Sequence, residues 1–348
     1  MTQQAGALKS QVGSGELRTV LESVLACHPG VCQRIAKLER RLTLYCTSST
    51  IEELSAHLAD GTTLELIFKN LSREALLETA RRVKPAFLYD PLREIETYRT
   101  VLARSALGTA ICYGTVVDHD IGRYWLLLER VPGLELYQVG DLATWQQVAR
   151  WLASMHTCFA GKTESLARSA PLLRYDSDFY WLWMSRAQTF LGRAESPQPE
   201  AVRHRIERLA KRYDRVVEHL LALPATFIHG EFYASNVLVH SREEQLRVCP
   251  VDWEMAAVGP GLIDLAALTA GRWTVPERTT LSMAYFAESM TRGAQWSGSE
   301  EFLTALDHCR LHVAVQWLGW SSEWSPPLEH TQDWLSEALS LSEKLGLA

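Results

Sequence analysis

The chain has 348 residues, of which 47% are hydrophobic and 22% are charged, and its formal net charge is −6. This size and composition exclude fibrous and wholly disordered proteins, and they are typical of a globular chain with one large or two medium domains. An acidic chain without clusters of Lys and Arg is a poor partner for nucleic acid. No apolar stretch is long enough to span a membrane, and seven cysteines without a repeating spacing predict reduced thiols. We therefore expect a cytoplasmic protein without a nucleic-acid or membrane partner.

The first part of the chain is predicted to be a mixed α/β region. Residues 1–15 are polar and rich in Gly, Ser and Gln, which predicts a disordered tail. Alternating and β-branched residues then predict an antiparallel meander of three strands, at 41–46, 51–58 and 62–68. The small polar turn at 47–50 joins the first two strands.

A helix and two further strands complete this first region. Apolar residues at helical intervals after Pro91 predict a helix over 92–102. Clusters of β-branched, aromatic and Leu residues predict strands at 109–117 and 124–130. The residues Val131-Pro-Gly133 break this pattern, so we place a domain boundary there, between a region at 16–131 and a region at 132–348.

The second region is predicted to be mainly helical. Helical spacing of apolar residues and turn signals predict helices at 145–159, 201–221 and 264–270, and a short hairpin with strands at 237–240 and 246–251. The first of these helices contains His156, which we interpret as a buried residue near the helix end.

The hairpin is surrounded by residues suited to a magnesium and nucleotide site. Within Phe227–Val239 stand His229, Glu231 and Asn236, and Asp252 follows the hairpin. The carbonyl oxygen of Asn236 and the carboxylate of Asp252 are hard ligands of the kind that Mg²⁺ prefers, and they leave room for water and phosphate oxygens. Glu231 is placed to accept the proton of an alcohol that attacks a terminal phosphoryl group.

The first region provides complementary groups for a nucleotide. Lys69 lies at the end of the third predicted strand, and Glu94 and Glu96 on the following helix are able to orient it. The lysine is expected to contact the phosphates that are not transferred, under the hydroxyl and N–H groups of the 47–50 turn, which contains Ser48, Ser49 and Thr50. The backbone of the segment 126–131, which includes Glu129 and Val131, is expected to pair with the adenine edge.

Taken in order, these motifs resemble the aminoglycoside phosphotransferase and choline kinase family, a branch of the protein-kinase-like fold, from about residue 35 onward. The matching pieces are Leu-Ile-Phe-Lys69, Glu94-x-x-x-Tyr98, Leu-Leu-Glu-Arg-Val-Pro-Gly133, Leu-Ala-Ser-Met-His156, His229-Gly-Glu-x-x-x-x-Asn236, and Val-Asp252-Trp-Glu followed by Asp264-Leu-Ala. The resemblance implies an α+β, bilobal fold. Its N-lobe would be an antiparallel sheet with a helix that binds nucleotide, and its C-lobe would be mainly helical and bind the acceptor.

The resemblance also implies an activity and a role for each matching residue. The activity is transfer of the γ-phosphoryl group of ATP, or of GTP, to a hydroxyl group of a small molecule with Mg²⁺ as cofactor, by a monomer or a homodimer. Lys69 would bind phosphate with Glu94 as its ion-pair partner, Asn236 and Asp252 would hold the metal, and Glu231 would be the catalytic base. His229 would brace the catalytic loop, and Asp264 would stabilise that loop from the following helix.

One departure from the family pattern bears directly on activity. The family's loop usually contains His-Gly-Asp, whereas this chain has Glu231 after His229 and Gly230. The extra methylene displaces the carboxylate by about 1.3–1.5 Å if the backbone is held fixed. Misplacement by about 1 Å can lower a rate by about 10²-fold, and a general base contributes about 10²–10⁴-fold. The substitution is compatible with a reshaped active site and with a silent one.

The acceptor is indicated only by a group of aromatic and acidic residues. The chain has 12 tryptophans, and several of them stand near carboxylates. Such aromatic walls can hold a cationic or ring-shaped ligand, and they can equally serve as packing between helices. The candidates are Asp176, Asp178, Trp183, Trp320 and Glu323.

The sequence therefore favours a small-molecule kinase and leaves one main alternative. A catalytically silent relative that binds nucleotide or a metabolite, and acts through a partner protein, would also explain Glu231. A protein Ser/Thr kinase is less favoured, because the sequence has no Asp-Phe-Gly and Ala-Pro-Glu pair.

Overall fold

The computed structural model describes residues 12–28, 31–43, 48–192, 199–242, 245–320 and 332–347. The chain forms two compact units that divide between Pro132 and Gly133. Within the described ranges, no helix combines the length and the apolar character that crossing a membrane would require.

The N-terminal unit is built on a five-stranded sheet with the order β1-β2-β3-β5-β4, in which all neighbouring strands are antiparallel. Four helices and two short 3₁₀ turns accompany it. The elements are α1 (Ser14–Leu25), β1 (Ile35–Leu42), β2 (Ile51–Leu58), β3 (Thr63–Asn70), α2 (Glu78–Val83), α3 (Pro91–Glu96), a π-helix (Thr97–Leu102), β4 (Cys112–Asp118) and β5 (Arg123–Glu129), with the 3₁₀ turns at Arg73–Ala75 and Ala86–Leu88.

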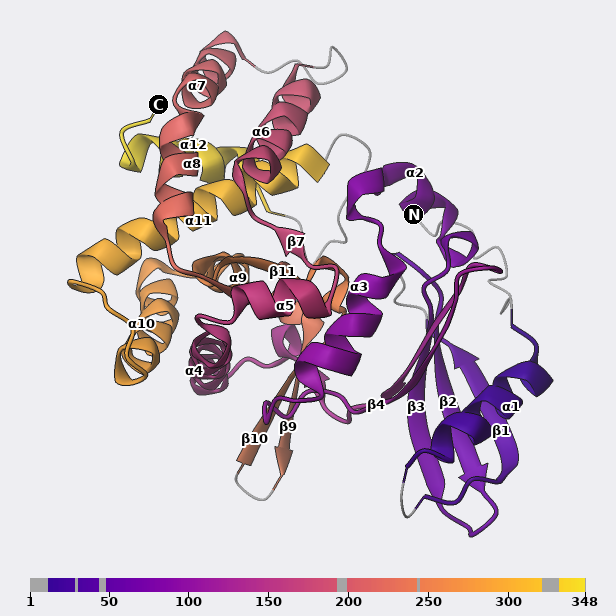
Figure 1. Ribbon diagram of the computed structural model, residues 1–348. Coiled ribbons are helices and arrows are strands. Elements are labelled where there is room, and N and C mark those ends of the chain that lie inside the picture. The colour runs from indigo at the N-terminus through magenta and orange to yellow at the C-terminus, as the bar shows by residue number, and fades with distance from the viewer. Residues whose placement is uncertain are drawn as a thin grey trace. The chain divides into compact units, whose positions relative to one another are not determined.

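One face of this sheet is covered by α1, which lies across the strands in Figure 1. The side chains of Leu17, Leu21 and Leu25 recur every four residues on one face of α1 and are fully buried. They pack in one cluster with alternate residues of β3, Leu66 and Phe68, and with Trp125 and Leu127 of β5. Because side chains alternate along a strand, the residues between these point to the opposite face of the sheet.

The opposite face is the one that faces α3. Pro91 occupies the first turn of α3, and the carboxylate of Asp90 caps the helix by accepting a hydrogen bond of 2.9 Å from the backbone N–H of Leu92. The helix buries Arg93, Glu94 and Ile95. A polar and charged strip is therefore held inside this unit.

The start of the chain differs from what the sequence predicts. The predicted position of the first strand, 41–46, is wrong, because the strand runs over Ile35–Leu42. Residues 44–47 lie outside the described ranges. The sequence pattern did not reveal this strand because it contains several charged residues. One of them, Arg40, does not extend into solvent but donates two hydrogen bonds to the buried carboxylate of Glu52. The helix α1, which begins at Ser14 inside the predicted tail, was not predicted at all.

The C-terminal unit is mainly helical and contains two small three-stranded sheets, β10-β9-β6 and β7-β11-β8. In Figure 1, β9 and β10 form a hairpin. The helices are α4 (Leu142–Phe159), α5 (Thr163–Ser169), α6 (Ser177–Leu191), α7 (Glu200–Lys211), α8 (Tyr213–Ala222), α9 (Leu262–Leu268), α10 (Val275–Thr291), α11 (Ser299–Trp320) and α12 (Trp334–Lys344). The strands are β6 (Leu134–Glu135), β7 (Leu173–Arg174), β8 (Ala225–Ile228), β9 (Val237–Arg242), β10 (Gln245–Pro250) and β11 (Ala257–Pro260), and the 3₁₀ turns are Leu136–Gln138, Ala234–Asn236 and Trp253–Met255.

The single helix predicted over 201–221 is in fact two helices. Arg212, with φ −116° and ψ 8°, leaves helical geometry and separates α7 from α8. The apolar spacing continues through the break, with Leu209, Tyr213 and Val216 all buried. The pattern therefore showed which residues are buried, but it did not show the bend.

Candidate active site

In the N-terminal unit, the charged strip between β3 and α3 centres on Lys69. Its ammonium group donates hydrogen bonds of 2.7 and 2.8 Å to the two carboxylate oxygens of Glu94. The side chains of Lys69 and Glu94 are only 6% and 2% exposed. Phe68 points into the apolar cluster on the other face, so strand alternation directs Lys69 toward α3. The pair is thus a buried, doubly hydrogen-bonded ion pair rather than a surface one.

The turn that precedes β2 is only partly described. Ser49 is buried and forms an isolated β-bridge with Leu76. The carbonyl group of Ser48 accepts a hydrogen bond of 3.0 Å from the backbone N–H of Leu77. Thr50 is half-buried, and Thr47 lies outside the described residues. The segment Ser48–Thr50 is therefore held against the chain that leads to α2.

At the end of β5, part of the segment predicted to pair with the adenine edge uses its backbone within the N-terminal unit. The backbone N–H of Glu129 donates to the carbonyl of Ile111 at 2.8 Å, and that of Arg130 donates to the carbonyl of Glu65 at 3.0 Å. The side chain of Glu129 accepts from the backbone N–H of Ile111 at 3.1 Å. Across the described ranges, no hydrogen bond uses the backbone of Val131.

In the C-terminal unit, residues 229–236 form the loop between β8 and β9, and one carboxylate holds its start. The two oxygens of Asp264 accept hydrogen bonds from the backbone N–H groups of His229 at 2.7 Å and Gly230 at 2.9 Å. Asp264 also accepts from Nε2 of His156 at 3.2 Å. Gly230 has φ 84°, and a Cβ at this position would stand 2.4 Å from the carbonyl oxygen of Met255. Only glycine fits this close approach.

The imidazole of His229 is a bracing group with both nitrogens in use. Its Nε2 donates to the carbonyl of Val251 at 2.9 Å, and its Nδ1 accepts from the backbone N–H of Glu231 at 3.3 Å. Because a carbonyl can only accept and an N–H can only donate, this pattern requires the neutral tautomer with the proton on Nε2. His229 joins the loop to the segment after β10, and it has no ring nitrogen left for a substrate.

Asn236 and Asp252 are brought to neighbouring strand ends. Val237 pairs with Pro250 in the β9–β10 hairpin, and the N–H of Val251 donates to the carbonyl of Asn236 at 2.9 Å. The side-chain nitrogen of Asn236 donates to the carbonyl of Glu231 at 3.0 Å, so this bond does not use the side-chain oxygen Oδ1. A carboxamide oxygen and a carboxylate on adjacent strand ends fit Mg²⁺, which is usually held by one or two protein groups together with phosphates and water.

No group of three or more His, Cys, Asp or Glu side chains suited to a metal occurs in the part of the chain that the structure describes. A site shared with a nucleotide remains compatible with Asn236 and Asp252.

The backbone of Asp252 is strained. It has φ 67° and ψ 61°, in the left-handed region, and it is the one residue other than glycine with a positive φ among those described. Asp adopts this conformation more readily than most residues, at a cost of about 1–3 kcal/mol. Such strain is common at ligand-binding positions, where the surrounding structure holds the residue in place.

Comparison with known proteins identifies the family of the chain. A family model described as the phosphotransferase enzyme family matches residues 79–298. The chain belongs to this family. No curated protein sequence matches the chain.

Solved structures show the fold. The chain is similar to a microcompartment-associated aminopropanol kinase, with 15% identity, a TM-score of 0.57, and 93% of this chain and 94% of that chain covered. It is similar to a choline kinase from Streptococcus pneumoniae, with 15% identity, a TM-score of 0.55 and coverage of 96% and 99%. It is also similar to an aminoglycoside 2′-phosphotransferase in complex with GDP, with 14% identity, a TM-score of 0.58 and coverage of 95% and 98%.

Two predictions from the sequence are thereby confirmed. The resemblance to aminoglycoside phosphotransferases and choline kinases is correct. So is the α+β protein-kinase-like fold, with an antiparallel sheet in the N-terminal region and a mainly helical C-terminal region.

Most of the residues predicted to bind the acceptor cap a helix or pack helices together. Asp176 caps α6 by accepting a hydrogen bond of 2.9 Å from the N–H of Phe179. Asp178 is exposed in the first turn of α6. Trp183 is fully buried, and its ring lies 5.4 Å from that of Trp320, so these two pack α6 against α11. Glu323 lies outside the described residues.

Tyr233, an aromatic residue of the 229–236 loop, was not singled out from the sequence, and its contact with Trp317 was not predicted. The indole N–H of Trp317 donates to the hydroxyl of Tyr233 at 2.6 Å. Burial first, and then the nearby charge of Glu231, raise the pKa of Tyr233. Burial raises the pKa of Tyr175 as well, followed by the charge of Asp264. The position of Tyr233 inside the motif could have drawn attention to it, but its partner is 84 residues away.

Proposed function

We propose that the protein transfers the γ-phosphoryl group of ATP to a hydroxyl group of a small molecule, in a reaction that depends on Mg²⁺. The observation that carries the proposal is the buried pair of Lys69 and Glu94. Replacing a buried ion pair by apolar residues is often neutral or stabilising, so stability alone gives little reason for such a pair. A lysine that must present its charge to phosphate groups gives a specific reason, and the phosphotransferase family of this chain supports it.

For the nucleotide, the proposal assigns roles to residues of the N-terminal unit. Lys69 contacts the phosphates that are not transferred, while Glu94 keeps the ammonium group in place. The backbone of Val131, which no hydrogen bond in the described ranges uses, pairs with the adenine edge. One structural relative holds GDP, so GTP is the competing donor to test.

For the chemistry, the proposal assigns roles to the loop and the segment after β10. Oδ1 of Asn236 and the carboxylate of Asp252 hold Mg²⁺, which neutralises charge on the phosphate oxygens when it is bound. Glu231 takes the proton of the acceptor hydroxyl while that oxygen forms a bond to the γ-phosphorus. The bond from the γ-phosphorus to the bridging oxygen breaks, and ADP leaves with the electron pair.

The alternative is a silent relative that binds nucleotide or metabolite and acts through a partner protein. The observation that favours it is Glu231 itself, whose extra methylene moves the carboxylate by about 1.3–1.5 Å on an unchanged backbone. The chain retains Lys69, Asn236 and Asp252. Their presence favours an active phosphotransferase.

The deciding experiment is phosphoryl transfer from ATP or GTP to a pooled library of amino alcohols, aminoglycosides and sugars, with and without Mg²⁺. We expect turnover in the wild type and a loss of about 10²–10⁴-fold in Glu231→Gln, because the base is removed. Asp252→Asn should abolish Mg²⁺-dependent turnover while keeping a residue that tolerates the left-handed backbone. Nucleotide binding without turnover in the wild type and in Glu231→Asp would favour the silent alternative.

A further inference from the structure

The catalytic loop closes on itself around Phe232. The N–H of Tyr233 donates to the carbonyl of Glu231 at 2.7 Å, a three-residue turn. The side chain of Phe232 is fully buried and stacks on Trp151 of α4, with ring centroids 6.1 Å apart. The turn therefore leaves Glu231 and Tyr233 as its two half-buried flanking residues.

The hydroxyl of Tyr233 is oriented by α11. The indole of Trp317 can only donate, so in the 2.6 Å contact between them the tyrosine oxygen is the acceptor. A hydroxyl group that accepts in this way keeps its own proton and can donate it to a second acceptor. The ring of Tyr233 meets that of Trp317 edge-on, with centroids 5.4 Å apart and planes at 67°, which fixes the ring as well as the oxygen.

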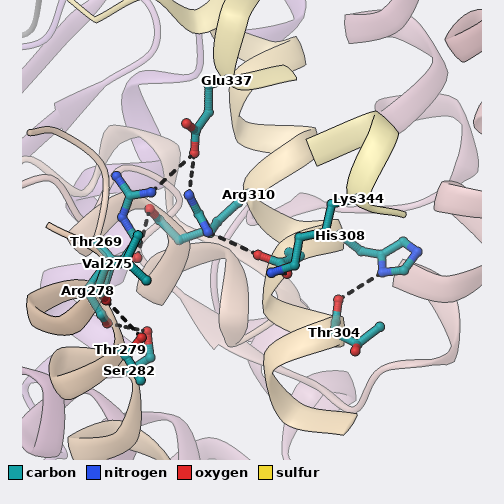
Figure 2. A network of polar contacts seen from close by, with 12 residues as sticks. Thr269, Val275, Arg278, Thr279, Ser282, Thr304, His308, Arg310, Glu337 and Lys344 are labelled. Carbon is teal, nitrogen blue, oxygen red and sulfur yellow. Dashed lines mark hydrogen bonds and ion pairs between the residues drawn. The ribbon is translucent and has the colours of Figure 1, made fainter. Parts of the chain in front are cut away.

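Trp317 is itself supported from behind by α12. The ring of Trp334 stacks on it at 5.2 Å with an interplanar angle of 4°, and both rings are 8% exposed. One turn further along α12, Glu337 lies between two arginines: Arg310 of α11 donates to it, and Arg278 of α10 stands 3.6 Å away (Figure 2). Three helices thus hold the aromatic pair that reaches the loop.

We propose that Tyr233 is a positioning residue, and that its hydroxyl, oriented by Trp317, donates a hydrogen bond to the carboxylate of Glu231. The proposal deepens the function above and rests on it. A Glu side chain has one more rotatable bond than Asp, so its carboxylate needs an additional restraint to stay in one place. The tyrosine hydroxyl supplies that restraint, and a hydrogen bond to a charged acceptor is stronger than one between neutral groups.

The kinetic test uses Tyr233→Phe, which removes the hydroxyl and keeps the ring. We expect kcat to fall by about 10–100-fold, because the base is no longer held in position. The KM for the nucleotide should stay within about twofold, because uniform binding is unaffected. Trp317→Phe should lower kcat in the same way, and the double variant should be no slower than Tyr233→Phe alone, because Trp317 acts through Tyr233.

The matched control is Tyr213→Phe. Tyr213 is a fully buried tyrosine, and its hydroxyl forms a hydrogen bond of 3.0 Å with Nδ1 of His312. Its kcat should equal that of the wild type. If Tyr213→Phe and Tyr233→Phe lowered kcat equally, the loss would come from the general packing of a tyrosine hydroxyl. The proposal would then be wrong.

A second measurement does not depend on turnover. Urea unfolding of the wild type, Tyr233→Phe, Glu231→Ala and the double variant forms a mutant cycle for the two side chains. We expect Tyr233→Phe to raise the unfolding constant about tenfold more in the wild type than in the Glu231→Ala background, which corresponds to about 1.4 kcal/mol. The same change in both backgrounds would overturn the proposal even in an active enzyme. Coupling in a protein without turnover would keep the contact and refute the phosphotransferase function.

Discussion

The two units hold their candidate functional groups in opposite ways. In the N-terminal unit, one buried charge fixes another, and Lys69 has its position set by Glu94 through two hydrogen bonds. In the C-terminal unit, the loop backbone is fixed instead, by Asp264, His229 and the β9–β10 hairpin, and none of these is itself predicted to touch the phosphate. Removing either member of the charge pair removes the whole interaction. Removing one hydrogen bond from the loop lowers its stability only in part, and the side chains of the loop remain available for ligands.

The largest expected effect comes from breaking the charge pair. Lys69→Met removes the positive charge that balances the buried carboxylate of Glu94, so we expect the free energy of unfolding to fall by about 3–5 kcal/mol, measured by urea denaturation. The double variant Lys69→Met/Glu94→Leu should recover most of this stability, because neither charge of the pair is then left buried alone. Nucleotide binding, measured by calorimetry, should stay lost in both. Recovery of binding in the double variant would show that the pair serves stability alone.

The loop should respond to a milder change. Asp264→Asn keeps the shape but replaces an acceptor oxygen by a donor that faces the N–H groups of His229 and Gly230. We expect the free energy of unfolding to fall by about 2–3 kcal/mol, because at least one buried N–H loses its partner. A loss of kcat larger than this destabilisation explains, at a temperature where the variant is folded, would show that the loop backbone also orients Glu231. Unchanged unfolding and kcat would contradict the bracing role.

The pH dependence of stability should come partly from a buried histidine of the C-terminal unit. Burial lowers the pKa of His312 from 6.5 to about 3. The unfolded chain therefore binds this proton more readily, so its stabilising contribution is complete above about pH 6.5 and declines as the pH falls toward 3. Between pH 6.5 and 5 we expect a loss of about 2 kcal/mol.

The variant His312→Gln should flatten this dependence. Gln can still bond the hydroxyl of Tyr213 but does not titrate. Urea unfolding at several pH values would measure the slope, and equal slopes in the variant and the wild type would assign the dependence to other groups.

The smallest effect is expected at the edge of the C-terminal unit. Glu337→Gln weakens the contacts with Arg278 and Arg310, and the three side chains are 15–22% exposed, so water screens part of the interaction. We expect the free energy of unfolding to fall by about 1 kcal/mol. A fall in kcat similar to that of Tyr233→Phe would show that α12 controls the loop strongly, whereas an unchanged kcat would confine Glu337 to stability.

The sequence predicts a structural feature well when the residues that determine it are close together in the chain, and poorly when they are far apart. The strand Ile51–Leu58 was predicted with its observed bounds, because its apolar alternation is local. The first strand was misplaced because its arginine meets a buried glutamate of the next strand, a tertiary contact that alternation does not encode. Asp264 was assigned through family resemblance, and the contact of Tyr233 with Trp317 was missed because no local pattern links residues 84 positions apart.

The stack of Trp334 on Trp317 has a consequence for the order in which the protein matures during translation. Domains fold largely from the N-terminus as the ribosome elongates the chain. Every residue of the unit that contains Lys69 is synthesised before Gly133. Tyr233 must wait for α11 to reach Trp317, and Trp317 must wait for α12 to supply Trp334. A nascent chain can therefore form the buried pair of Lys69 and Glu94 well before its 229–236 loop is fully supported, and translation must pass Trp334 before that support is in place.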